Sequence, residues 1–565
     1  MASVTKKVKK GRTYYYITQC QRVNGKPRVV WQKYLGTVDR ILERMDATEP
    51  AAPKETALFE AGGVAALLRI VRRLGLRGLI DEIVPKRNQG PSVGHYMVLA
   101  ALNRALAPCS KVEIGRWYES TILRRLWGFG REAFSSQRFW DHMDRIDQEQ
   151  IDQIQERLLE KVGEEFGVQT DVLLFDTTNF FTFIASRNVR NHIARRGRNK
   201  QKRSDLRQVG LSLLASRAFQ VPLLHSVYEG NLNDLTVFPK AVRSLTGRYR
   251  SLISGEVPAT LVCDKGCLAE EVLEELAASR VHFVCSVPST YFPEILTTPV
   301  EKLTPLEGVP GTRAKSFLVE LWGKDCQVVL TYSESLYTQQ IDSITRQMVG
   351  AQKELSRLQT ALQQRAQGGG RGKRPTVASV RRKVGKILSG QYLPEVIQTT
   401  VKGRRGKIPT LSYEVDHAAL ARLGRRRLGR TLLVTDQLQW EPQEVVRTYR
   451  GLARIEETFK NMKGTGFLRW QPAWHWTDQK LRVHGFYCVL ALTLVRLLRK
   501  VACEAGEQLS VPKLLKELSG IKEVALIYPE GYKKRGAGRL THSRMSKRQL
   551  RLAKALEIGE VMAWG

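Results

Sequence analysis

The sequence predicts an α/β fold built around a mixed sheet flanked by helices, and three observations lead to this expectation. Between residues 168 and 290, apolar strand-like segments alternate with helical ones in the order three strands, helix, strand, helix, strand. A long insertion, 291–432, then interrupts the pattern before another apolar strand at 431–434. Finally, 91 Lys and Arg against 55 Asp and Glu give the 565-residue chain a net charge of +36, which indicates a polyanionic partner such as nucleic acid.

Composition and periodicity predict each element of the alternating region. Two apolar runs, Val172–Asp176 and Thr260–Asp264, are expected to be buried strands that end at an aspartate. The remaining elements are expected as strands at 209–216, 221–228 and 281–286 and as helices at 236–245 and 268–279.

The rest of the chain divides by composition. Tyr14–Ile17 and Arg28–Trp31 flank an Asn24-Gly25 turn and predict a small β unit. Helical spacing at 64–74 and 92–106 indicates a helical region that either docks DNA ends or serves as a scaffold. We therefore expect six parts: a β unit at 1–50, a helical region at 51–165, the first part of the core at 166–290, an insertion at 291–432, the second part of the core at 433–515 and a basic C-terminal tail at 516–565.

Within the insertion, apolar residues repeat at heptad spacing on both sides of a Gly- and Arg-rich loop, 368–375. This pattern predicts an antiparallel helical hairpin with a basic tip. The positions of the seam are Ile341, Ile344, Met348, Ala351, Leu355, Leu358 and Leu362 before the loop and Val377, Val380, Val384 and Ile387 after it.

Three carboxylates carry the functional prediction: Asp176, Asp264 and Glu456. Singly, each could be a turn former, a helix cap or a solvated residue. Together they are typical of a site that binds hard cations, since two such ions roughly 3.5–4 Å apart can activate an attacking oxygen and stabilise a leaving one. On so basic a chain, they predict an enzyme that cuts and joins nucleic acid with two Mg²⁺ ions, for which Mn²⁺ can substitute.

Tyr449, Glu456 and Lys463 are seven residues apart, so they drift only ~20° per step and share one face of a helix. On that face, Lys463 could hold a phosphate beside the carboxylate. The neighbouring Glu457 points about 100° away and shares its stripe with Arg450, which predicts a more solvated side chain.

The order of elements resembles the ribonuclease-H-like core, in which the first and fourth strands lie side by side. The motifs resemble those of DDE transposases of bacterial insertion sequences, in the group with a Tyr-Arg-Glu-Lys signature. The resemblance covers about residues 165–500. It rests on Asp176-Thr177-Thr178, Cys263-Asp264-Lys265-Gly266, the Tyr449, Glu456 and Lys463 triplet, Ser204–Val209 and Glu229-Gly230-Asn231.

This resemblance implies cleavage at the ends of a mobile element, followed by attack of the freed 3′-hydroxyl on target DNA. It implies that Tyr449 and Lys463 position phosphates, that the insertion helps to manage the flanking strand, and that cleavage commonly proceeds through a hairpin intermediate. A homodimer is expected in the DNA complex. One position departs from the signature, because its Arg is Leu452 here; Arg450 or Arg454 could substitute.

The basic stretch 187–207 follows the first aspartate and contains a single acid, Asp205. It predicts contact with double-stranded DNA, and a solvated loop is the alternative. Trp470, Trp474 and Trp476 could stack on an unpaired base, but core packing is the commoner fate of tryptophan, so we interpret them, like His484, as structural. The residues expected to bind DNA here are Arg195, Arg196, Arg198, Lys200, Lys202 and Arg203.

Two other functions stay open: a structure-selective nuclease of the same fold, and a non-catalytic DNA-binding protein derived from a transposase. The long insertion argues against the first and the three acids against the second. Scattered cysteines without metal-ligand spacing predict buried thiols in a reducing cytoplasm. The longest apolar stretch, 485–495, is too short to span a bilayer and predicts a buried helix rather than a membrane partner.

Overall fold

The computed structural model describes residues 2–23, 25–46, 53–87, 89–185, 187–199, 201–232, 239, 242–244, 247, 259–264, 269–278, 280–369, 372–404, 406–464, 466–528 and 538–562. They form two compact units. One comprises the chain up to Glu60 together with Ile521–Arg544, and the other comprises Ala61–Gly520 together with Met545–Ala563.

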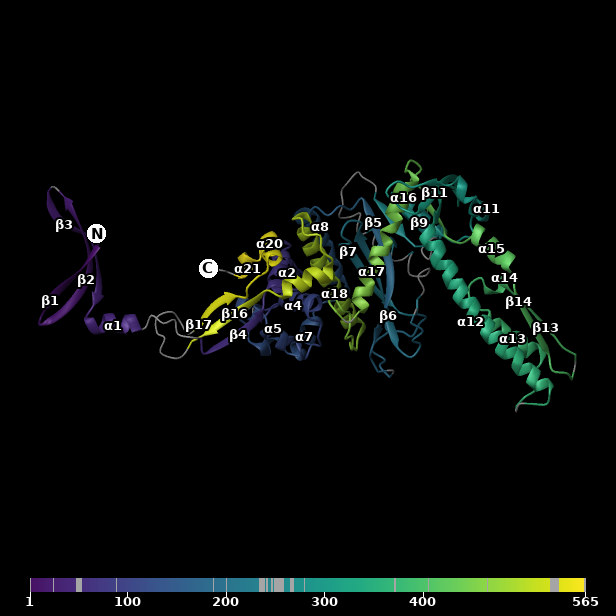
Figure 1. Cartoon of the computed structure of the whole chain (residues 1–565), viewed down its shortest axis with the longest axis horizontal. Helices are drawn as coiled ribbons and strands as arrows, with labels where there is room; N and C mark the ends of the chain where they lie inside the picture. Colours follow the sequence, from purple (N-terminus) through teal and green to yellow (C-terminus); the bar gives the residue numbers. More distant parts are fainter. Residues whose placement is uncertain are drawn as a thin grey trace. The chain divides into compact units, whose positions relative to one another are not determined.

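Two small antiparallel sheets make up the first unit (Figure 1). One is the meander β1-β2-β3, followed by helix α1, and the other has the strand order β17-β16-β4. The predicted strands at 14–17 and 28–31 are confirmed as parts of β2 and β3, whereas the expected turn residue Asn24 lies outside the described residues. The bounds are β1 Ala2–Lys9, β2 Arg12–Val23, β3 Lys26–Gly36, α1 Val38–Asp46, β4 Glu55–Glu60, β16 Lys522–Ile527 and β17 Gly538–His542.

The structure differs from two expectations in this region. The helical region was expected to begin at 51, yet β4 precedes its first helix. The residues 516–565 were expected to form a tail, yet they contain β16, β17 and helix α20 (Lys547–Ala555). Both differences have one cause: β16 pairs with β4 more than 450 positions away, and a local pattern carries no signal of so distant a partner.

A nine-stranded mixed sheet organises the second unit, in the order β10-β11-β12-β15-β9-β8-β5-β6-β7. The pairs β5–β8 and β8–β9 are parallel, and the others are antiparallel. The expected adjacency of the first and fourth core strands, β5 and β8, is confirmed. The bounds are β5 Val172–Thr182, β6 Arg207–Ser216, β7 Pro222–Glu229, β8 Thr260–Cys263, β9 His282–Val287, β10 Thr304–Pro305, β11 Thr312–Leu321, β12 Lys324–Ser333 and β15 Arg430–Thr435.

Two predictions about this sheet need correction. Strand β5 was expected to end at Asp176 but continues to Thr182. The reason is that β6 pairs with β5 as far as Thr182, well past the point where β8 ends. The insertion was expected to span 291–432 as a separate part, yet its strands β10, β11 and β12 join the same sheet next to β15. The predicted helix 236–245 lies largely outside the described residues.

Helices cover this sheet, and the expected apolar runs at 64–74 and 92–106 are confirmed as α2 and α4. The predicted buried helix at 485–495 is the centre of α18, which is buried along most of its length and packs against α2, α4, α8 and β7. The helices are α2 Gly62–Arg73, α3 Leu76–Ile83, α4 Val93–Leu106, α5 Ile114–Glu119, α6 Leu123–Trp127, α7 Ser136–Met143, α8 Gln148–Phe166, α10 Glu270–Ala278, α11 Pro293–Leu296, α16 Pro442–Arg450, α17 Leu452–Lys463, α18 Asp478–Glu504, α19 Val511–Ser519 and α21 Gly559–Met562.

The predicted helical hairpin is present, with α12 (Glu334–Ala366) packed against α13 (Val377–Ile387) (Figure 1). Its heptad positions bury Ala351, Leu355 and Val380 in one apolar cluster. That cluster continues into a β-ribbon and two short helices, so the hairpin is a packed part of the fold. Their bounds are α14 Leu393–Val396, β13 Ile397–Lys402, β14 Thr410–Val415 and α15 His417–Arg426. Throughout the described part of the chain, every helix is too short or too polar to cross a membrane.

A cationic cluster is buried where α4 meets α18. Lys111 Nζ donates to the hydroxyl of Tyr487 at 2.9 Å, and Arg104 donates to three backbone carbonyls. Burial, followed by the nearby charge of Arg104, lowers the pKa of Lys111 to about 7. Burial likewise lowers the pKa values of His475 and His484 well below their ordinary value. The folded state therefore disfavours protonation at this cluster.

We predict that this cluster makes stability depend on pH. Between pH 7 and about 10.5, the unfolded chain binds the Lys111 proton that the folded chain has released, so the free energy of unfolding should rise by at most about 1.4 kcal/mol per pH unit. Lys111→Met should flatten the rise in denaturation midpoint between pH 7 and 9. The exposed control Lys161→Met should follow the wild type. Equal slopes for Lys111→Met and wild type would contradict the prediction.

Candidate metal and DNA-binding site

Asp176 and Asp264 lie on neighbouring parallel strands. Each pair in the β5–β8 ladder joins residue n to residue n + 88, as Leu174 pairs with Val262. The same register carries Asp176 to Asp264, one position beyond the end of β8. Neighbouring strands lie about 4.8 Å apart, and paired side chains point to the same face. The two carboxylates therefore leave the sheet side by side.

Two hydroxyl groups hold the Asp264 carboxylate. Ser286 Oγ, on β9, donates to Asp264 Oδ1 at 2.8 Å, and the phenol of Tyr449, on α16, donates to the same oxygen at 3.1 Å. Burial raises the pKa of Tyr449, and the negative charge of Asp264 raises it further, so the phenol stays protonated. Because both donors are neutral, they orient the carboxylate without cancelling its charge.

Helix α17 lies along β5 on the face that carries Asp176 (Figure 1). At the start of the helix, Gly451 lies so close to Leu174 that an added Cβ would be 3.1 Å from Leu174 Cδ2. At its end, Lys463 Nζ donates to Thr178 Oγ1 at 2.5 Å. Leu174, Asp176 and Thr178 alternate on one face of the strand. Asp176 therefore lies midway between the two points where α17 contacts β5.

Glu456 is on the middle turn of α17 and shares the stripe of Lys463. Glu457 lies about 100° away around the helix, and its charge acts on the buried Arg496 of α18, which donates to the hydroxyl of Thr458. Burial lowers the pKa of Arg496 to about 10, and the charge of Glu457 opposes that change. Both glutamates are exposed. Helical geometry thus puts Glu456 on the stripe of Lys463 and Glu457 off that stripe.

The expectation of one helix for Tyr449, Glu456 and Lys463 was wrong, because the chain forms α16 and α17 with Gly451 between them. Close packing of Gly451 on β5 accompanies the break. Tyr449 still reaches Asp264 from the end of α16.

Arg450 and Arg454, the two residues that could replace the signature arginine, have different surroundings. Arg450 Nη2 donates to Thr312 Oγ1 on β11 at 2.7 Å, whereas Arg454 is exposed on α17.

The three carboxylates that the sequence predicts belong to three elements: β5, the end of β8 and α17. No three His, Cys, Asp or Glu side chains in the described residues are close enough together to form a ready-made cation cage. The donor set of Asp176, Asp264 and Glu456 is nevertheless all carboxylate, the ligand type that Mg²⁺ and Mn²⁺ prefer. The hydroxyls on Asp264 are the kind of outer support that metal ligands commonly have. The residues therefore fit divalent cations in chemistry. Lys265 and Gly266 lie outside the described residues.

The basic stretch 187–207 is anchored to the protein core at several backbone positions. The carboxylate of Asp478, at the start of α18, accepts from the backbone N–H groups of His192 and Ile193 at 2.7 and 3.0 Å. Arg195 forms an isolated bridge with Gln208. These bonds fix the path of the backbone while its cationic side chains stay outside. The exposed ones expected to bind DNA are Arg195, Arg196, Arg198, Lys202 and Arg203; Lys200 lies outside the described residues.

Arg203 differs from the other cations of the stretch because it forms a two-point ion pair with Asp205, at 2.8 and 2.6 Å. A hydrogen bond from Arg203 lowers the pKa of Asp205 to about 2. Part of its charge is therefore already matched, and we expect Arg203 to contribute less to phosphate binding than Arg195, Arg196 or Arg198. In the sequence, only the two-residue spacing between Arg203 and Asp205 indicates this ion pair.

The structural interpretation of the tryptophans is confirmed for one of the three. Trp470 is fully buried and stacks on Phe180 with ring centroids 4.3 Å apart. Trp474 and Trp476 are 53% and 56% exposed, so for them the interpretation was wrong. His484 is buried as expected, within hydrogen-bonding distance of His475 and Tyr487.

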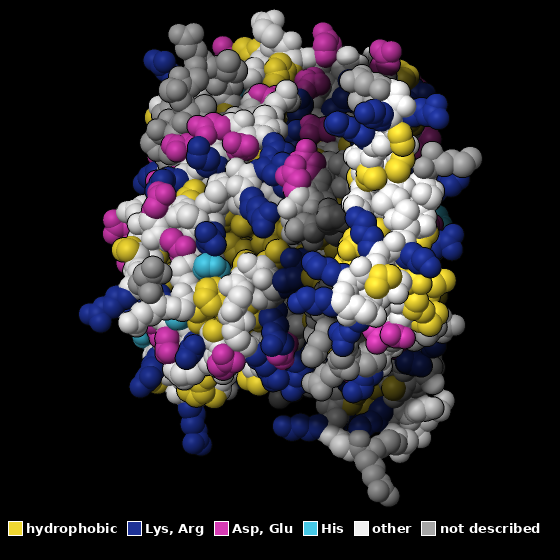
Figure 2. All heavy atoms as spheres, turned by 90° about the vertical axis from the view of Figure 1, so that its left-hand side faces the viewer, with side chains coloured by type: hydrophobic (Ala, Val, Ile, Leu, Met, Phe, Trp, Pro, Cys, Tyr) yellow, Lys and Arg dark blue, Asp and Glu magenta, His cyan; other side chains and the backbone are white. Residues whose placement is uncertain are grey.

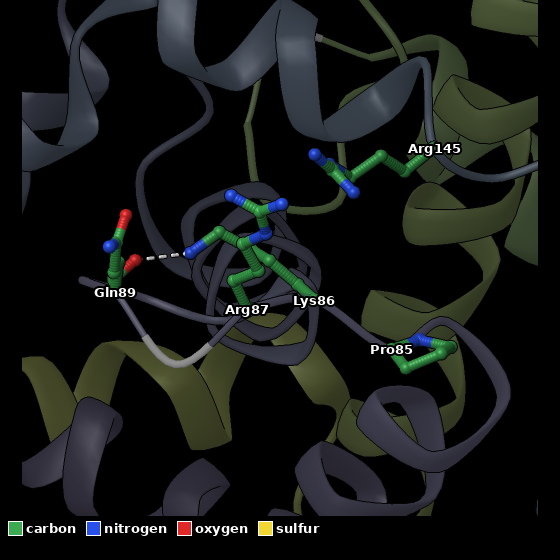
Figure 3. A pocket seen from close by; sticks show the side chains of 5 residues that line it. All are labelled: Pro85, Lys86, Arg87, Gln89 and Arg145. Atoms are coloured by element: carbon green, nitrogen blue, oxygen red, sulfur yellow. Dashed lines mark hydrogen bonds between the residues drawn. The ribbon is translucent and has the colours of Figure 1, made fainter.

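Sequence reasoning missed a basic cavity of about 510 Å³ lined by Pro85, Lys86, Arg87, Gln89 and Arg145 (Figure 3). Lys86 Nζ donates to the carbonyls of Gln89 and Pro91. Burial lowers the pKa of Lys86, and the charge of Arg145 adds to that effect. The cavity is therefore a concentrated positive site. Lys and Arg side chains are also widespread on the face shown in Figure 2.

Comparison with known proteins gives the following. No family model matches the chain, and no curated protein matches it. Among solved structures, it is similar to the piggyBac transposase synaptic complex with hairpin DNA, with a TM-score of 0.37, 10% identity and coverage of 83% of this chain and 82% of that one. It is also similar to the Mos1 transposase paired-end complex with the left transposon end, with a TM-score of 0.15, 8% identity and coverage of 37% and 63%. At these TM-scores, neither likeness assigns a function.

We predict that the anchored basic stretch contacts DNA phosphates. Replacing Arg195, Arg196 and Arg198 by Ala should weaken binding and reduce the slope of log K against log salt by roughly 0.9 for each phosphate that the chain no longer neutralises. The control removes the same charge from exposed positions on α13, with Arg381, Arg382 and Lys383 replaced by Ala. Equal changes in both variants would mean that only net charge matters, and an unchanged slope would identify a solvated loop.

Proposed function

We propose that this chain is a DNA transposase of the DDE type, which cleaves the ends of an insertion sequence and joins them to target DNA by two-metal phosphoryl transfer. The observation that carries the proposal is the β5–β8 register, in which position 176 corresponds to position 264, together with the packing of α17, the helix that carries Glu456, along β5. The sequence motifs and the basic charge support the same conclusion.

The strand arrangement further supports a ribonuclease-H-like core. Strands β7-β6-β5-β8-β9 run in the order 3-2-1-4-5 of the core elements, with the first three antiparallel and the last two parallel to the first. The sequence resemblance implies one feature of this arrangement, the adjacency of the first and fourth strands. The insertion enters after β9 and returns to the sheet at β15, before α16 and α17.

Asp176, Asp264 and Glu456 would hold two Mg²⁺ ions, or Mn²⁺ in their place. When bound, such ions supply Lewis acidity for an in-line displacement at phosphorus. The chain itself contributes orientation: Ser286 and Tyr449 fix the Asp264 carboxylate, and α17, which carries Glu456, packs along β5.

Phosphate binding would fall to the surrounding cations. Lys463 is already directed across β5, where its Nζ meets Thr178 and lies 5.5 Å from the centre of the Phe180 ring. An ammonium group at this position can bind a phosphate next to the carboxylates. The basic stretch and the cavity at Lys86 would hold DNA further out, in a complex that we expect to contain two copies of the chain.

The two alternatives differ from a transposase in what they do to a labelled donor end. A transposase joins the end to target DNA, a structure-selective nuclease only cuts it, and a DNA-binding protein does neither. Short inverted repeats on both sides of the gene would add independent support for a mobile element.

We predict that Asp176→Asn and Asp264→Asn each abolish cleavage in Mg²⁺ but leave end binding nearly intact. The substitutions remove metal-ligand charge and leave the phosphate-binding cations in place. Asp325→Asn, at an exposed position on β12 of the same sheet, is the matched control and should stay active. Near wild-type cleavage by either test variant would refute the assignment.

We predict a contrast between the two neighbouring glutamates of α17. Glu456→Gln should abolish cleavage, whereas Glu457→Gln should cost at most roughly a few-fold, because neighbouring residues of a helix point about 100° apart and Glu457 is off the stripe of Glu456 and Lys463. Measuring the thermal midpoint of both variants separates catalysis from helix stability. A dead Glu457 variant beside an active Glu456 variant would overturn the register of the helix.

A further inference from the structure

Two exposed tryptophans, Trp474 and Trp476, lie near the C-terminal end of β5. Phe183, directly after β5, donates its backbone N–H to the carbonyl of Ala473 at 3.0 Å. The next residues alternate in exposure: Ala473 and His475 are buried, whereas Trp474 and Trp476 are more than half exposed. This alternation is the period of an extended chain, so both indoles project from one side.

The backbone that carries these indoles is held rigidly. His475 Nε2 lies 2.7 Å from His484 Nδ1 inside the core, and its ring meets Trp140 edge-on. The carbonyl of Trp476 accepts a hydrogen bond from Asn188 Nδ2 at 2.9 Å. Two large apolar side chains therefore stay in solvent on a backbone that the core fixes.

Around the two indoles, the surface is apolar nearby and cationic at its edge. Phe183 is 43% exposed and Val189 is 82% exposed. Arg187 and Arg190 flank Val189 in the basic stretch and are exposed as well. Aromatic faces beside a cationic backbone track are the combination that binds unpaired nucleic acid, since every base has a face that can stack. A protein partner would not require the adjacent excess of positive charge.

The segment from Lys463 to Trp476 follows β5 from the proposed catalytic site to these indoles. Along β5, Lys463 contacts Thr178, Trp470 stacks on Phe180 and Ala473 bonds to Phe183. From Asp176 to Phe183 the strand covers seven residues, about 23 Å at roughly 3.3 Å per residue. Duplex rise is about 3.4 Å per nucleotide, so a more extended single strand would span this path in fewer than about seven nucleotides.

We propose that Trp474 and Trp476, with Phe183 beside them, form a stacking platform for a single-stranded DNA segment that leaves the duplex a few nucleotides from the cut. The proposal deepens the proposed function and rests on it for the location of the cut. The platform binds bases through their faces and so favours an unpaired strand over a duplex, without preference for sequence.

The test measures binding without cleavage, in EDTA, with a duplex end that carries no extension, an extension of about two nucleotides or one of about eight. The longest extension should tighten binding of the wild-type chain roughly tenfold, and the shortest should add little. Trp474→Ala and Trp476→Ala should lose this gain while duplex affinity is unchanged. Trp474→Phe should retain most of it, and Trp31→Ala, at an exposed tryptophan on β3, should behave as wild type.

A second measurement needs no variant. 2-Aminopurine placed at successive positions of the extension should show its strongest quenching several nucleotides from the duplex end. Quenching nearest the junction, a tail preference that survives the double alanine variant, or an equal loss of duplex and tailed binding would each overturn the platform. Because no outcome requires catalysis, failure of the platform and failure of the transposase proposal are separate results: cleavage assays in Mg²⁺ decide the latter.

Discussion

The parallel pairing of β5 with β8 is the constraint on which the rest of the site depends. A slip of one residue in this register would move Asp264 out of step with Asp176 and turn one of them to the opposite face of the sheet. The register is well protected, because the paired segments Leu173-Leu174 and Leu261-Val262 are fully buried. Their burial drives the pairing, and the position of the carboxylates follows from it.

The carboxylate at the centre of this site and the cations at its edge have different kinds of partner. At the centre, Asp264 receives neutral hydroxyls from Ser286 and Tyr449, which fix its direction without adding positive charge. Toward the edge, the basic stretch carries exposed cations in large excess over acids, and Arg203 with Asp205 forms an ion pair among them.

Local sequence patterns predicted the elements of the core because buried strands are rich in apolar residues, as Val172–Phe175 is. They also predicted the stripe of Glu456 and Lys463, which depends only on helical geometry. The predictions failed where an element depends on a partner that is distant in the sequence. Pairing with β6 extends β5 past Asp176, and β4 forms by pairing with β16. The break at Gly451 was missed for the same reason, because it accompanies close contact with Leu174 on another strand.

The start of α18 positions two basic segments of the chain at once. Asp478 holds the backbone of the basic stretch, Gln479 donates to the carbonyl of Ile146 at 2.5 Å, and Lys480 pairs with Asp144. Ile146 directly follows Arg145, whose guanidinium lines the basic cavity. Three consecutive residues thus tie two cationic surfaces to one largely buried helix. Surfaces ordered in this way lose little conformational freedom when they bind, so more of their electrostatic attraction remains as affinity.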